Sequence, residues 1–118
     1  YYPKAMQLDV LLTMTQESLD KYYPDLKPGG TLVIDDVLVT NIPTENFYGL
    51  PFTRLAREEA GHLMVANVIA LGAIAALTGV VSKEALLKVV LARAPRGTEE
   101  KNEKAVEIGF REGLRIKK

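Results

Sequence analysis

The chain has 118 residues, of which 47% are hydrophobic and 25% charged, a composition typical of one globular domain over residues 1–118. Fifteen basic residues balance fifteen acidic ones, so no net charge attracts nucleic acid or an anionic membrane. The absence of cysteine excludes a disulfide framework, a thiolate-bound metal or cluster in this chain and a cysteine nucleophile, and we expect a cytoplasmic location. Since the chain starts at Tyr1 without a methionine, we also expect a fragment or a processed product.

The first third of the chain predicts a strand, a helix and a second strand. Nearly continuous apolar runs over residues 9–14 and 31–34 are typical of strands that are buried on both faces in a parallel sheet. Thr15 is a suitable N-cap for the helix between them, and residues 27–30 predict a turn into the second strand. Together these elements predict a βαβ unit.

The rest of the chain predicts a loop, a short third strand and four helices. The polar residues 36–46 indicate a surface loop, and we expect the strand at residues 47–50. The helices are expected at about residues 53–60, 66–78, 82–93 and from 98 onward, with a frayed end at 115–118. Three strands make a poor sheet for this many helices, so further strands are expected from an N-terminal segment or from another chain.

One segment resembles a membrane span, because residues 63–81 contain no charge. Thr78 and Gly79 predict a helix end, with Gly79 in the left-handed cap conformation. The remaining helix of about 20 Å is too short for a hydrocarbon core of about 30 Å. Since it is rich in Ala and Gly, we predict a buried helix that packs closely on its neighbours, with Gly72 at a point of close contact.

Candidate ligand-binding residues follow the first two strands, because ligands of doubly wound folds bind beyond the carboxyl ends of the strands. These residues are Thr13, Thr15, Gln16, Asp35 and Asp36. An acidic residue there can bind a ribose hydroxyl, but it is more common as a turn former, and Thr15 is more common as a helix cap.

Three further candidates lie in the helical part. His62 is the only histidine, and we interpret it as structural. For Asn67 we favour a structural role, either as a cap of the uncharged helix or in a core hydrogen bond. The alternative is a contact with a ligand at the helix N-terminus. A basic group near the C-terminus is interspersed with glutamates, so we interpret it as solvated surface: Arg93, Arg96, Lys101 and Lys104. The residues assemble into no catalytic triad, metal cluster or carboxylate pair, so no catalytic or metal-binding residue is assigned.

Residues 9–35, 48–57, 65–82 and 95–109 resemble, in this order, the gamma subunit of 2-oxoacid:ferredoxin oxidoreductases. The most specific part is the Ala-Asn-x-x-Ala-Leu-Gly-Ala helix with the following Leu-Thr-Gly, and residues 95–109 look most like the 2-oxoglutarate branch among pyruvate, ketoisovalerate and 2-oxoglutarate enzymes. The resemblance implies a Rossmann-like α/β fold: three layers, with a mostly parallel sheet and flanking helices, incomplete at the N-terminus. It also implies that the family's N-terminal third, with its Gly-rich loop, is missing.

The resemblance implies a subunit that is an enzyme only in its complex. The family decarboxylates a 2-oxoacid, transfers the acyl group to coenzyme A and passes electrons to ferredoxin. Thiamine diphosphate and iron–sulfur clusters belong to partner subunits (alpha, beta and possibly delta), and coenzyme A is a cosubstrate that Asn67 is expected to contact. No membrane partner is expected. Two alternatives remain open: a non-catalytic structural or interaction module, and the C-terminal half of an S-adenosylmethionine methyltransferase, which would continue into an antiparallel hairpin.

Overall fold

The computed structural model describes residues 8–117. Its contacts divide the chain into two compact units, residues 1–50 and 51–118, which are considered separately below. The interpretation of residues 1–118 as a single domain stays a prediction.

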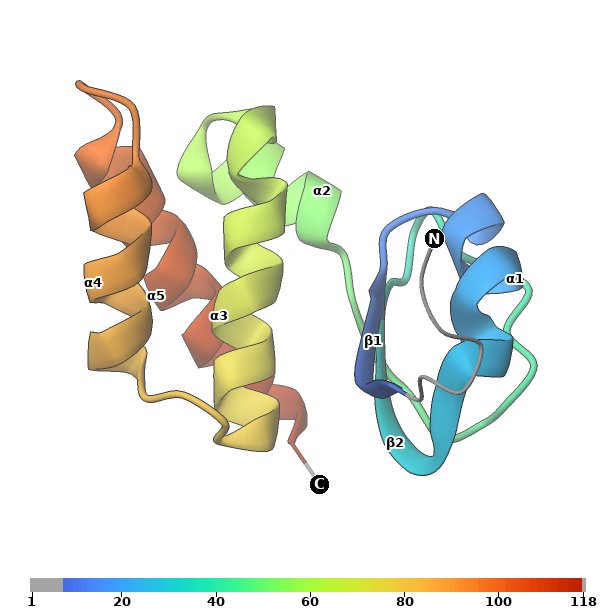
Figure 1. Cartoon of the computed structure of the whole chain (residues 1–118). Helices are drawn as coiled ribbons and strands as arrows, with labels where there is room; N and C mark the ends of the chain where they lie inside the picture. The colour runs from blue at the N-terminus through green and yellow to red at the C-terminus, as the bar shows by residue number, and fades with distance from the viewer. Residues whose placement is uncertain (1–7, 118) are drawn as a thin grey trace. The chain divides into compact units, whose positions relative to one another are not determined.

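The first unit contains the predicted βαβ arrangement (Figure 1), followed by a third strand. Strand β1 (Leu8–Thr13), helix α1 (Gln16–Tyr22) and strand β2 (Leu26–Asp35) are followed by the short strand β3 (Tyr48–Leu50). A 3-10 turn joins α1 to β2. The strands pair in parallel in the order β1-β2-β3. The predicted α/β class with a parallel sheet is therefore confirmed.

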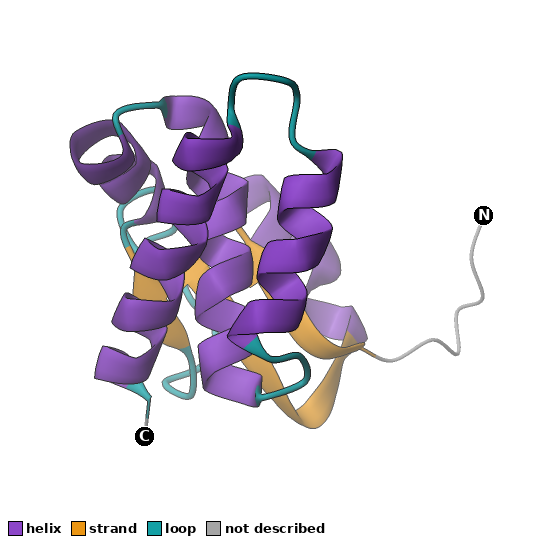
Figure 2. Cartoon of the chain, turned by 90° about the vertical axis from the view of Figure 1, so that its left-hand side faces the viewer, coloured by secondary structure: helices purple, strands orange, loops and turns teal. Residues whose placement is uncertain are grey.

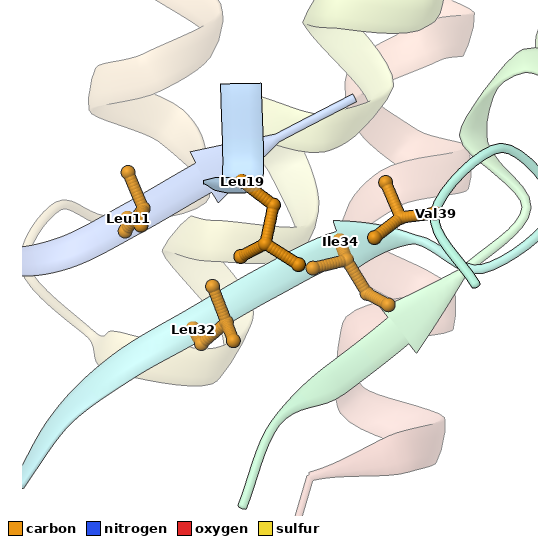
Figure 3. Close-up of a cluster of buried hydrophobic side chains, with 5 residues drawn as sticks. All are labelled: Leu11, Leu19, Leu32, Ile34 and Val39. Atoms are coloured by element: carbon orange, nitrogen blue, oxygen red, sulfur yellow. The ribbon is translucent and has the colours of Figure 1, made fainter. Parts of the chain in front are cut away.

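The core of this unit lies between the sheet and α1 (Figure 3). Leu11, Leu32 and Ile34 come from the strands, and Leu19 is the fully buried residue of α1. Burial of one such leucine contributes about 2 kcal/mol. The fifth member, Val39, belongs to the segment predicted as a surface loop and is only 1% exposed. The predicted surface loop is thus confirmed for most of residues 36–46, but Val39 packs into the core.

The start of β2 differs from the predicted turn at residues 27–30. Leu26 pairs with Leu8 and Thr31 pairs with Val10, so β2 advances five residues while β1 advances two. The surplus residues form a bulge, in which Gly29 adopts a left-handed φ of 82°. The sequence signal for a turn into the second strand therefore marks a bulge inside that strand.

The second unit is helical. It contains α2 (Phe52–Leu55), a π-helical turn (Ala56–Ala60), a 3-10 turn (Leu63–Val65), α3 (Ala66–Thr78), α4 (Lys83–Arg93) and α5 (Glu99–Ile116). Figure 2 views this unit from the side of α4. The four predicted helices are confirmed within a few residues, and Ser82 caps α4 by accepting a hydrogen bond from the Ala85 amide at 3.0 Å. The expected frayed end is wrong for Arg115 and Ile116, which are helical, and Lys118 lies outside the described residues.

The uncharged helix α3 ends as predicted. Gly79 follows Thr78 with a φ of 69°, and its amide donates to the Ala75 carbonyl at 2.9 Å. Within residues 8–117, no helix combines the length and the apolarity that crossing a membrane requires.

Helices α3 and α5 approach each other with their backbones nearly in contact. A Cβ added at Gly72 would lie 2.6 Å from the Val106 carbonyl oxygen. One added at Gly109 would overlap the Ile69 carbonyl group, and one at Gly113 would lie 2.8 Å from the Ala73 oxygen. The predicted close packing at Gly72 is confirmed, and two glycines of α5 complete it.

Ion pairs join the other elements of this unit to α5. Lys83 of α4 contacts Glu107 at 2.9 Å, and the hydrogen bond and charge of Glu107 raise the Lys83 pKa. Arg111 contacts Glu59 of the π-helical turn at 2.9 Å. Burial would raise the pKa of Glu112, but hydrogen bonds from Arg115 and Arg111 outweigh it and hold that pKa below its ordinary value. These contacts hold the π-helical turn and α4 against α5.

Candidate functional site

The residues predicted beyond β1 form part of the first unit's scaffold. Thr15 caps α1, since its hydroxyl oxygen accepts a hydrogen bond from the Ser18 amide at 3.2 Å. Thr13 is 1% exposed, and its hydroxyl has no hydrogen-bond partner within residues 8–117. The cap that we favoured for Thr15 is confirmed, whereas the isolated hydroxyl of Thr13 was not foreseen.

Gln16 holds the loop after β2. Its Oε1 accepts hydrogen bonds from the amides of Thr40 at 3.1 Å and Asn41 at 3.0 Å. Its Nε2 donates to the Asn41 carbonyl at 2.7 Å and to Asp20 at 3.0 Å. The Gln16 side chain therefore ties α1 to the loop after β2, which contains the buried Val39.

Asp35 forms the turn at the end of β2. It is fully buried, and its Oδ1 accepts hydrogen bonds from the amides of Val37 at 3.0 Å and Leu38 at 3.3 Å. Such a bond two residues ahead is an Asx turn. Asp36 is exposed, and its amide donates to the Leu50 carbonyl of β3 at 3.1 Å. The turn role favoured for Asp35 is confirmed.

His62 shapes the chain just before α3. Its Nδ1 accepts a hydrogen bond from the Met64 amide at 3.2 Å, so the proton of the neutral ring lies on Nε2. Its own amide donates to the Ala56 carbonyl at 3.0 Å. The structural role predicted for His62 is confirmed.

Asn67 lies in the first turn of α3 with its side chain exposed. The N-cap position of α3 is Val65, and no side chain caps it. Asn67 makes no hydrogen bond to another described residue, so the capping or core role that we favoured is wrong within residues 8–117. Its amide faces solvent next to the helix N-terminus, where backbone N–H groups point outward.

A pocket of about 350 Å³ lies beside this helix end, within the second unit. Its walls include the apolar side chains of Met64, Val65 and Pro95. The polar lining consists of His62, Thr98, Lys101 and Asn102. Sequence reasoning missed this pocket, because its two sides come from the approach to α3 and from the start of α5, which are more than thirty residues apart in the sequence.

The basic residues near the C-terminus differ in their positions. Arg93, Arg96, Lys101 and Lys104 are exposed, as the surface interpretation expects, but Lys101 also lines the pocket. Among the described residues, no three His, Asp or Glu side chains are placed to hold a metal ion. Residues 8–117 therefore offer no group of three such side chains as metal ligands.

The geometry matches solved structures of one enzyme class. The chain is 47% identical to the gamma subunit of a keto/oxoacid ferredoxin oxidoreductase from Geobacter sulfurreducens PCA, with a TM-score of 0.89 over 93% of this chain and 66% of that one. A 2-oxoglutarate:ferredoxin oxidoreductase from Magnetococcus marinus, solved with 2-oxoglutarate, coenzyme A and succinyl-CoA bound, shares the fold. Its TM-score is 0.72 at 21% identity, over 99% of this chain and 21% of that one.

Sequence comparison gives a consistent result. The 2-oxoglutarate synthase subunit KorC of Methanocaldococcus jannaschii is 42% identical over 113 residues, covering 92% of this chain. The chain spans about 60% of the length of the curated relatives that it matches. The antiparallel hairpin expected of a methyltransferase does not occur within residues 8–117. The model of the pyruvate ferredoxin/flavodoxin oxidoreductase family matches residues 1–112, and the chain therefore belongs to this family.

Proposed function

We propose that this chain serves as the gamma subunit of a 2-oxoacid:ferredoxin oxidoreductase. The supporting observation is the 42% identity to a 2-oxoglutarate synthase subunit, together with the fold of a solved gamma subunit. The substrate we infer is 2-oxoglutarate. In the proposed reaction it loses carbon dioxide, its acyl group forms the thioester bond of succinyl-CoA, and the released electron pair passes to ferredoxin.

The proposal divides the chemistry between subunits. Thiamine diphosphate and iron–sulfur clusters would be held by alpha, beta and possibly delta subunits, and they would supply decarboxylation and electron transfer. This chain has no cysteine with which to ligate a cluster. The cytoplasmic location expected from the sequence is part of the same proposal.

Within this chain, we assign Asn67 to a contact with coenzyme A. The exposed position in the first turn of α3 and the absence of an intramolecular hydrogen bond within residues 8–117 support this role. An amide can both donate to a phosphate or carbonyl oxygen and accept from an amide of the pantetheine arm. The Asn67 contact would affect the binding of coenzyme A and would not touch the reacting carbon of the 2-oxoacid.

The test is an anaerobic pull-down of the tagged, full-length subunit from its own cells. We expect the eluate to reduce a viologen dye only when both 2-oxoglutarate and coenzyme A are present, and to contain thiamine and iron. Pyruvate and branched-chain 2-oxoacids, assayed in parallel, identify the preferred substrate. Recovery of the subunit alone, without dye reduction, would contradict the proposal.

A further inference from the structure

We infer that the pocket beside His62 and Lys101 binds a carboxylate that is attached to an apolar group. This inference goes beyond the proposed function, because Asn67 does not line the pocket. The volume of about 350 Å³ lies at the lower end of the range for ligand-binding pockets. It therefore fits a small ligand or one side chain of a larger one.

The charge of the lining selects an anion. Lys101 contributes the one full charge, and no Asp or Glu is among the lining residues. No ion pair joins Lys101 to a described residue, whereas Lys27 and Lys83 are both paired with carboxylates. An unpaired ammonium at the rim of a pocket without acidic groups favours a negatively charged ligand.

A hydrogen-bond donor of His62 reinforces this preference. His62 uses Nδ1 as the acceptor from the Met64 amide, which leaves the Nε2 proton of the neutral ring as its remaining polar function. The Thr98 hydroxyl, by contrast, is already engaged, because it donates to the Pro95 carbonyl at 2.6 Å.

Apolar walls select the other part of the ligand. Val65 is buried, Pro95 has no N–H group, and Met64 is a flexible thioether that is 82% exposed. Asn102 is 9% exposed, and its Nδ2 donates to the carbonyl and hydroxyl oxygens of Thr98, so it is already engaged. The pocket therefore combines one charged side chain with apolar walls, the combination that suits an aliphatic or aromatic acid.

Such a carboxylate has two possible sources, a free organic acid or the carboxyl terminus of a polypeptide. The three methionines of the chain provide a direct assay, because Met64 lines the pocket and Met14 does not. We would label the methionine methyl groups of the full-length subunit with carbon-13 and titrate it with 4-methylpentanoate, 4-methylpentanamide and N-acetyl-leucine. Each titration follows the methyl signals by NMR, with Met14 as internal reference.

We expect both acids to shift the Met64 signal, and the neutral amide to bind at least fivefold more weakly. Lys101→Gln should weaken binding of the acids about five- to tenfold, as expected for loss of one exposed charge-assisted contact. Lys104→Gln, on the same helix but outside the pocket lining, is the matched control and should bind as the wild type does.

The outcomes separate the sources and can overturn the inference. Tighter binding of N-acetyl-leucine assigns the pocket to a polypeptide carboxyl terminus, and tighter binding of 4-methylpentanoate assigns it to a free acid. Equal binding of acid and amide, equal effects of the two lysine variants, or no shift at Met64 would refute the inference. None of these results depends on the oxidoreductase activity, so failure here is distinguishable from failure of the proposed function.

Discussion

Replacement of Gly109 by Ala tests whether backbone contact between α3 and α5 holds the helical unit together. On helix propensity alone, Ala is favoured over Gly by about 1 kcal/mol. The added Cβ, however, would overlap the Ile69 carbonyl and lie 3.0 Å from the Ala73 nitrogen. Both groups are backbone, so no side-chain rotation relieves the overlap and the helices must separate.

Overpacking of this kind costs about 3 kcal/mol. After the gain in helix propensity, we expect Gly109→Ala to lower the free energy of unfolding by about 2 kcal/mol. For a chain of this size, that corresponds to a decrease of roughly 8 °C in Tm. The assay is thermal and urea unfolding of the subunit, followed by far-ultraviolet circular dichroism.

Two further variants of α5 calibrate the result. Gly113→Ala should destabilise less, because its nearest obstacles lie at 2.8 Å and 2.9 Å and one of them is the Ala76 methyl group. Glu103→Ala changes an exposed position of the same helix and should remain within about 0.5 kcal/mol of the wild type. If Gly109→Ala were as stable as Glu103→Ala, the reasoning from backbone contact would be wrong.

Three other predictions concern the ligand contact, an isolated hydroxyl and a titrating carboxylate. Asn67→Ala should raise the KM for coenzyme A about fivefold in the assembled enzyme, as expected for one hydrogen bond, with subunit stability unchanged; a lower Tm with normal kinetics would assign Asn67 a structural role. Thr13→Val should stabilise the subunit by about 1 kcal/mol in urea unfolding, because it removes an unpaired buried hydroxyl; destabilisation would reveal a missing partner. Glu112→Gln should destabilise at pH 7 by up to about 1 kcal/mol. Since the folded pKa of Glu112 is lowered, this stabilisation is fully present above the ordinary value of 4.5, and the difference between variant and wild type should vanish as the pH falls through the lowered folded pKa.

Local sequence patterns correctly predict helix ends and turns that depend on a single residue. Thr15 and Ser82 cap their helices through their own hydroxyl groups, and Gly79 ends α3 because it accepts a left-handed φ. These interactions span a few residues, so the sequence contains all of their determinants. Asp35 belongs to the same class, since its turn involves only the next three residues.

The remaining features depend on contacts between distant segments. The β2 bulge follows from the register with β1, and the burial of Val39 follows from the packing of its loop on the sheet and the hydrogen bonds of Gln16. The type and position of Asn67 predict a cap or a core hydrogen bond, but the N-cap position of α3 is Val65 and the Asn67 side chain is exposed. The pocket combines residues more than thirty positions apart, for which a single sequence gives no signal.

The dependence of α3 on α5 has a consequence for synthesis of the chain. Translation proceeds from the N-terminus, so α3 leaves the ribosome before the helix against which its glycine and alanine face packs. Until Gly109 and Gly113 have emerged, an uncharged helix of 13 residues lacks its cover and is prone to associate with other apolar surfaces. A chain truncated before α5 should therefore aggregate or recruit chaperones, even though every residue of α3 is present.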